Sequence, residues 1–82
     1  MRVRVEHWDI INGRRTAPDH CPVALAVRRQ SGRSKIAVSS YSVDLLDGMK
    51  DAELPPEARQ FVRDFDSGRP VKPFSFELEL PR

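Results

Sequence analysis

Two stretches, near the two ends of the chain, alternate between apolar and polar residues. In residues 2–6, Val3 and Val5 fall on one face and charged residues occupy the other. In residues 74–80, every even-numbered position is Phe or Leu, and the odd positions are Ser or Glu. A period of two is typical of half-buried β-strands, so each stretch is predicted to be a strand with one face in the core.

Residues 54–66 change to the helical period. Pro55 and Pro56 suit a first turn, Leu54 can fold back as a hydrophobic staple, and Gly68 suits the left-handed end of a helix. All four phenylalanines lie in this helix and the strand after it, so we expect the unit to form most of the core. The predicted apolar face of the helix consists of Ala58, Phe61, Val62 and Phe65.

A second helix is predicted over residues 20–29. Asp19 is the expected N-cap, and Pro22 falls within the first turn. Arg28 and Arg29 lie at the C-terminal end, where the helix dipole favours cations, and Gly32 follows as the stop.

The rest of the chain predicts shorter elements. Residues 35–39 and 41–45 alternate and indicate two strands, joined at Ser39 and Ser40 by a tight turn or a bulge, or merged into one long bent strand. Residues 7–13 fit either a helical turn or an extension of the first strand, and residues 47–53 are predicted to be a polar loop.

These elements predict one small α+β domain spanning residues 1–82, in the order β-α-β-β-α-β. A four-stranded antiparallel sheet with both helices on one face, ferredoxin-like or related, satisfies this order. A different arrangement of the same elements is also consistent with the pattern.

Composition narrows the class of protein. Charged residues make up 32% and hydrophobic residues 39%, which fits a folded domain, and no apolar run is long enough to cross a membrane. Cys21 is the single cysteine, so an internal disulfide is excluded, and the N-terminus lacks the apolar segment of a secretory signal. We therefore expect a cytoplasmic protein.

Charge is unevenly distributed along the chain. Residues 1–41 carry a net charge of +5 and residues 42–82 a net charge of −3, although the total is only +2. This uneven distribution has two explanations. The charges in each half simply solvate the surface of that half, or they steer an anionic partner to one side of the molecule. The basic set is Arg14, Arg15, Arg28, Arg29, Arg33 and Lys35, and the acidic set is Asp44, Asp47, Asp51, Glu53, Asp64 and Asp66.

Side chains with catalytic or metal-binding chemistry are few. Cys21 beside His20 at a helix start resembles an activated thiol, but a cysteine packed as a small hydrophobe explains it better. His7, Asp9, Asp19, His20 and Cys21 lack the paired spacing of zinc ligands, and the carboxylates around Gly48 lack the ladder of a calcium loop. We expect no catalytic residue, cofactor or metal.

Contacts with a partner are the remaining candidate chemistry. Interfaces favour Trp, Tyr and Arg as anchors, although Trp8 is equally suited to the core. Asp64 and Asp66 lie at the unfavourable end of their helix, which indicates either a partner surface or compensation by Arg63 and Arg69. The candidate partner-binding residues are Trp8, Arg14, Arg15, Arg28, Arg29, Tyr41, Asp64 and Asp66.

Two segments carry a resemblance: HCPVALA at residues 20–26, and residues 54–76 with the core FVRDFDSGRPVKPFSF. They resemble a family of small proteins of phages, prophages and related bacterial mobile elements. The resemblance covers about half the chain and carries over no catalytic or binding residue. It implies an accessory role, such as inhibition of a host defence, the class that includes anti-CRISPR proteins.

The sequence and the resemblance together predict a non-enzymatic protein that covers a functional surface of a host protein or nucleoprotein complex, as a monomer or homodimer. The alternative is an autonomous nucleic-acid-binding module that uses the basic set from Arg14 to Lys35, with Trp8 or Tyr41 stacking bases. A third class, an enzyme that uses Cys21 and His20, predicts loss of activity in Cys21→Ser.

Overall fold

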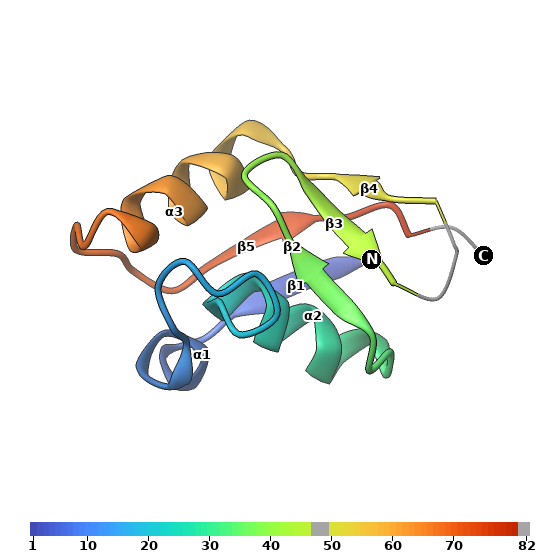
Figure 1. The fold of residues 1–82 in the computed structure, drawn as a ribbon, viewed down its shortest axis with the longest axis horizontal. Helices are drawn as coiled ribbons and strands as arrows, with labels where there is room; N and C mark the ends of the chain where they lie inside the picture. Colours follow the sequence, from blue (N-terminus) through green and yellow to red (C-terminus); the bar gives the residue numbers. More distant parts are fainter. Residues whose placement is uncertain (47–49, 81–82) are drawn as a thin grey trace.

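The computed structural model describes residues 1–46 and 50–80 and has an α+β architecture, as predicted. Three helices and two small antiparallel sheets surround one core (Figure 1). The elements in chain order are β1 (Arg2–Val5), α1 (His7–Asn12), α2 (Pro22–Ser31), β2 (Ile36–Val38), β3 (Ser42–Leu45), β4 (Ala52–Glu53), α3 (Pro56–Asp66) and β5 (Phe74–Glu77).

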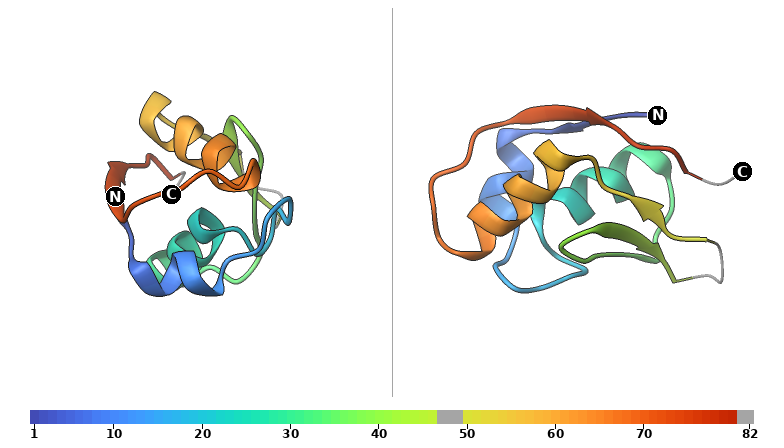
Figure 2. Two further views of the ribbon diagram at one scale, coloured as in Figure 1. Left: turned by 90° about the vertical axis from the view of Figure 1, so that its left-hand side faces the viewer. Right: turned by 90° about the horizontal axis from the view of Figure 1, so that it is seen from above.

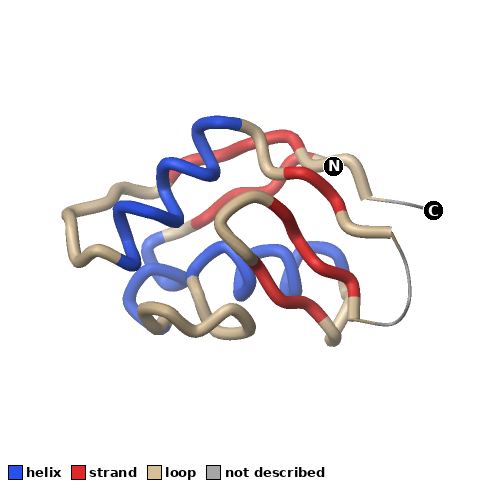
Figure 3. The backbone as a smooth tube through the Cα atoms, turned by 45° about the horizontal axis from the view of Figure 1, so that its top comes forward, coloured by secondary structure: helices blue, strands red, loops and turns tan. Residues whose placement is uncertain are grey.

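The predicted single four-stranded sheet is wrong. β1 pairs with β5, aligning Val3 with Phe76, while β2, β3 and β4 form a separate sheet in that order. The two groups of strands are separate in Figure 3. The helices do not share one face either: α3 covers the core from one side and α1 and α2 from the other (Figure 2).

One side chain occupies backbone groups on the unpaired edge of β1. The Arg4 N–H donates to Gln30 Oε1 at 2.8 Å, and Gln30 Nε2 donates to the Arg4 carbonyl oxygen at 2.6 Å. The amide of Gln30, in the last turns of α2, therefore takes the hydrogen bonds that a neighbouring strand would make. A four-stranded sheet through this edge of β1 would need those same backbone groups.

Two elements extend the predicted order, which becomes β-α-α-β-β-β-α-β. Residues 7–13, where helix and strand were both open, form the short helix α1. β4 lies in the predicted polar loop, where Ala52 pairs with Val43. The tight turn between the two middle strands is confirmed, because Ser39 Oγ accepts hydrogen bonds from the N–H groups of Tyr41 and Ser42.

The core is less aromatic than expected. Phe61 and Phe76 are buried, but Phe65 and Phe74 are only partly buried at its margin. Aliphatic side chains of β1, of α2 and of the three-stranded sheet supply much of the rest, so the expectation that the last helix and strand form most of the core is wrong. The alternation predicted for the first strand is confirmed, with Val3 and Val5 buried.

The predicted helix stops are confirmed. Gly32 ends α2 in a left-handed conformation with φ of 74°, and its N–H donates to the Arg28 carbonyl oxygen. Among residues 1–46 and 50–80, no helix combines the length and the apolar character needed to pass through a bilayer.

Candidate partner-binding site

An open groove of about 360 Å³ lies where α1 meets the C-terminal half of α2. It is lined by Trp8 and Leu25 and by three arginines, Arg28, Arg29 and Arg33. We call it the Trp8 groove. It brings together three of the candidate residues that the sequence singled out, which are separated by about twenty positions along the chain.

Trp8 is an exposed side chain and not part of the core. It sits in the first turn of α1, where the Glu6 N–H donates to Asp9 Oδ2 at 2.8 Å and fixes the start of the helix. Ile10 packs against the core, whereas Trp8 is 58% exposed and Ile11 66% exposed. Since residues three apart share a helix face, α1 presents an apolar strip beside the groove.

Arg29 is occupied by an internal ion pair. Its Nη2 donates to Asp9 Oδ2 at 2.6 Å, and its Nη1 lies 3.3 Å from Glu6 Oε2. The Asp9 side chain is fully buried, so this pair compensates a carboxylate that would otherwise be costly to bury. Sequence analysis considered Asp9 only as a metal ligand. Its role depends on Arg29, twenty residues away, and no local signal indicates it.

Arg28 differs from its neighbour. Its Nε and Nη2 atoms are buried and have no hydrogen-bond partner within the described parts of the chain. A guanidinium that is removed from water without an acceptor is unusual, because buried polar groups in native structures are generally paired. The Arg28 charge acts at longer range on the carboxylate of Asp19, whose pKa it helps to lower.

The basic set does not form one patch. The Arg14 N–H donates to the His20 carbonyl oxygen just before α2 begins. The Arg15 guanidinium lies beside Gly68. It is about 3.3 Å from the position that a Cβ atom on residue 68 would occupy. These two arginines are at the N-terminal end of α2, and Arg28 and Arg29 are near the other end of a helix that is about 15 Å long.

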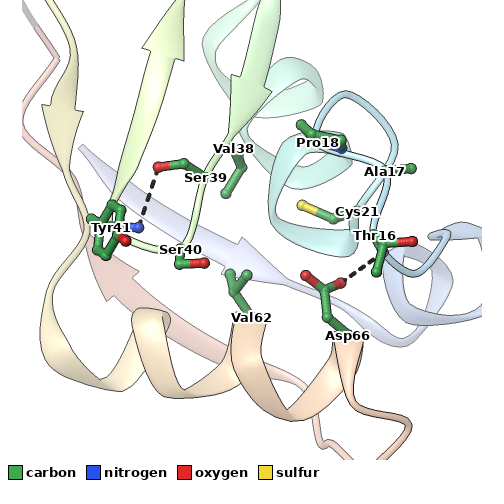
Figure 4. A pocket seen from close by; sticks show the side chains of 10 residues that line it. All are labelled: Thr16, Ala17, Pro18, Cys21, Val38, Ser39, Ser40, Tyr41, Val62 and Asp66. Atoms are coloured by element: carbon green, nitrogen blue, oxygen red, sulfur yellow. Dashed lines mark hydrogen bonds between the residues drawn. The ribbon is translucent and has the colours of Figure 1, made fainter.

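Tyr41 and Asp66 belong to a different pocket, of about 270 Å³, between the start of α2, the β2–β3 turn and α3 (Figure 4). Tyr41 is 67% exposed at its rim. Asp66 Oδ1 accepts a hydrogen bond of 3.0 Å from the N–H of Thr16, whose φ of 53° is rare for a residue other than glycine. This carboxylate therefore holds the loop before α2 in its conformation.

The thiol of Cys21 faces the same pocket but is buried. Burial raises its pKa to about 11, and its Sγ accepts a hydrogen bond from the Ala24 N–H as the N-cap of α2. Asp19 is not the cap, contrary to expectation: it pairs with His20 at 3.1 Å, a bond that lowers the pKa of Asp19. A protonated, buried thiol is a packing and capping group.

The other titratable candidates have internal partners. Asp64 Oδ1 accepts hydrogen bonds from Gln60 and from Arg69, at 2.8 and 3.0 Å, so compensation within the chain explains its place near the end of α3. No three His, Cys, Asp or Glu side chains converge as metal ligands in residues 1–46 and 50–80. Of the acidic set, Asp47 lies outside the described residues.

Comparison of the chain with family models, with curated proteins and with solved structures finds no match. The resemblance to small phage proteins stays a prediction. The assignment of the Trp8 groove as a candidate site therefore depends on the geometry of this chain alone.

Proposed function

We propose that this is a non-enzymatic binding protein that covers a functional surface of a larger host protein or nucleoprotein complex and blocks it sterically. The proposal includes a role as a phage or mobile-element accessory protein in the host cytoplasm, plausible targets being CRISPR–Cas complexes. The Trp8 groove is the contact surface in this proposal.

The observation that carries the proposal is the groove's composition. An exposed tryptophan stands beside three arginines, and two buried nitrogens of one of them, Arg28, have no hydrogen-bond partner in the described parts of the chain. Trp and Arg are the residue types that most often dominate the binding energy of interfaces. Exposed apolar side chains gathered on α1, rather than scattered singly, also mark interaction surfaces.

The rival, an autonomous module that grips nucleic acid with the whole basic set, has weaker support. A continuous cationic track would need Arg14 and Arg15 on the same surface as Arg28 and Arg29. The two pairs of arginines lie at opposite ends of α2, and the acidic Asp66 lies next to the pair formed by Arg14 and Arg15.

The test is capture from a bacterial host lysate with the tagged protein as bait, before and after nuclease treatment. The wild-type bait should retain a stoichiometric, nuclease-resistant protein partner, and Trp8→Ala should lose it. Tyr41→Ala is the matched control, because Tyr41 is an equally exposed aromatic residue on another pocket. Capture of nucleic acid only, or equal loss in both variants, would contradict the proposal.

A further inference from the structure

A second open groove, of about 520 Å³, lies between β4 and the end of β5, beyond the start of α3 (Figure 1). We call it the β4–β5 groove. We propose that it binds an extended peptide segment of a protein partner, which carries lysine or arginine at alternate positions and adds as a strand to the outer edge of β5. This goes beyond the proposed function, because it concerns a different surface and does not involve Trp8.

The outer edge of β5 carries backbone groups that no strand uses. Met1 and Leu78 exchange both backbone hydrogen bonds across the β1–β5 pair. Antiparallel pairs alternate between hydrogen-bonded and non-hydrogen-bonded positions, so the N–H and C=O of Glu77 point away from β1. Within the described ranges, no strand pairs with β5 on that side. The edge is therefore a template for an added strand.

The edge of β4 borders the same groove from the other sheet. The Leu54 N–H donates to the Tyr41 carbonyl oxygen at 2.8 Å, so residue 54 is bonded to the chain before β3. Glu53 is the preceding residue, and by the same alternation its N–H and C=O point away from β3. The groove thus has strand edges on both sides. Extended peptides bind such edges through their own backbone groups.

Carboxylates determine which peptide fits. Those that line the groove belong to the exposed residues Asp51, Glu53, Glu77 and Glu79. Among the described residues that line it, Arg59 is the basic one, and its Nε donates to the Leu54 carbonyl oxygen at 2.8 Å. The lining therefore carries an excess of negative charge, which attracts a basic segment.

Most of this negative charge is not compensated within the chain. Glu77 lies 3.6 Å from Arg2. The carboxylates of Asp51, Glu53 and Glu79 have no ion pair with residues 1–46 or 50–80. They remain available to cations of a partner.

The spacing of the carboxylates favours a strand over other ligands. Residues two apart lie on one face of an extended chain, as Glu77 and Glu79 do, and basic side chains at alternate positions of an added strand can lie opposite them. No three of these groups converge as metal ligands in the parts of the chain that the structure describes. Nucleic acid is repelled by the negative charge, and a second copy would place like charges opposite each other.

The first measurement is the fluorescence anisotropy of a short, labelled and capped peptide in which lysine and valine alternate. It should bind the full chain saturably at low salt and more weakly as salt is added. Hydrogen exchange at the Glu77 amide should slow on binding, because this N–H becomes bonded to the peptide. The corresponding peptide of alternating glutamate and valine is the comparison ligand and should not bind.

Backbone methylation of the peptide separates strand addition from attraction between charges. N-methyl groups on alternate residues keep the positive charge but remove the N–H donors on one side of the strand. Methylation of one alternating set should therefore abolish binding. Equal affinity of the unmodified peptide and of both methylated peptides would overturn the proposal.

Variants of the protein place the peptide in the groove. Glu53→Gln and Glu79→Gln should each weaken binding about threefold, and the double variant about tenfold, as expected for cross-strand charge pairs. Glu57→Gln is the matched control, because Glu57 is an exposed residue of α3 that lines a different groove. It should bind nearly as the wild type does. Unchanged melting temperatures would show that all the variants fold.

Three further results would contradict the proposal. They are no binding of the lysine–valine peptide at low salt, equal losses in the Glu57 and Glu79 variants, and an unchanged exchange rate at the Glu77 amide in the saturated complex. The proposed function is decided separately, because capture of a partner through Trp8 does not depend on this groove.

Discussion

Arg28 and Arg29 are adjacent in the sequence and on the same helix, yet they have different roles. Arg29 compensates the buried carboxylate of Asp9 and fastens α1 to α2, whereas the buried Nε and Nη2 of Arg28 have no hydrogen-bond partner in the described ranges. Sequence analysis treated them as equivalent contact candidates. The position of Asp9 distinguishes the two arginines. That position depends on residues 7–13, for which the sequence left both a helical turn and a strand extension open.

Cys21 gives a prediction at the same scale. Because burial raises its pKa to about 11, the thiol is protonated at neutral pH, and alkylation of the folded protein at pH 8 should be negligible until denaturant is added. Rapid alkylation of the native protein would contradict the buried, capping role.

The same thiol predicts a pH dependence of stability. The pKa in the folded state lies above that of an exposed thiol, so the stabilisation is complete below the unfolded pKa and is lost as pH rises towards 11. The loss should reach about 2–3 kcal/mol in the free energy of unfolding. Cys21→Ala, measured alongside by urea unfolding, should lack this part of the alkaline decline.

At the scale of elements, sequence periodicity predicted the long helices and the terminal strands well. α3 and β5 appear within a few residues of their predicted bounds, because their apolar positions repeat over several turns or pleats. The short α1 and the two-residue β4 could not be predicted. Six residues are too few for a clear helical period, and β4 is defined by its pairing with β3 rather than by its own sequence.

Packing of α3 on β5 predicts a large effect of Phe61→Ala. The Phe61 ring stacks on Phe74 with centroids 4.6 Å apart and is almost fully buried. Its removal should cost about 3–5 kcal/mol in the free energy of unfolding, a large share of the stability of so small a domain.

Phe65→Ala is the control for this prediction, since Phe65 belongs to the same stack but is only partly buried. Its loss should be clearly smaller in a parallel thermal and urea series. An unchanged melting temperature in Phe61→Ala would show that the core is not where the structure puts it.

At the scale of the whole molecule, strand order was beyond the reach of periodicity. The alternation in residues 2–6 shows which face of β1 is buried, but it carries no information on which edge is paired. At the unpaired edge, the backbone of Arg4 bonds to Gln30, which lies one residue beyond the predicted end of the second helix. The contact that occupies this edge joins residues 26 positions apart, which no periodicity along the chain reveals.

Gln30→Ala should accordingly loosen this corner of the molecule. Two hydrogen bonds are lost, and because the site is exposed, water replaces them in part, so the expected cost is about 1–2 kcal/mol in the free energy of unfolding. Hydrogen exchange at the Arg4 amide should accelerate.

Gln30→Glu is the matched variant for that measurement. A carboxylate can still accept from the Arg4 N–H but cannot donate to its carbonyl oxygen, so exchange at Arg4 should be intermediate. Wild-type exchange rates in both variants would rule out the edge contact.

The amide of Gln30 also has a consequence for how copies of the protein behave together. A bare edge on a two-stranded ribbon is a template on which other chains add strands and grow into fibrils. Here the Gln30 amide occupies the backbone groups of Arg4 on that edge, which many sheets protect with a further strand or a bulge. Loss of the amide would thus show itself during storage at high concentration, as insoluble cross-β material, before any change in the fold of the single molecule became visible.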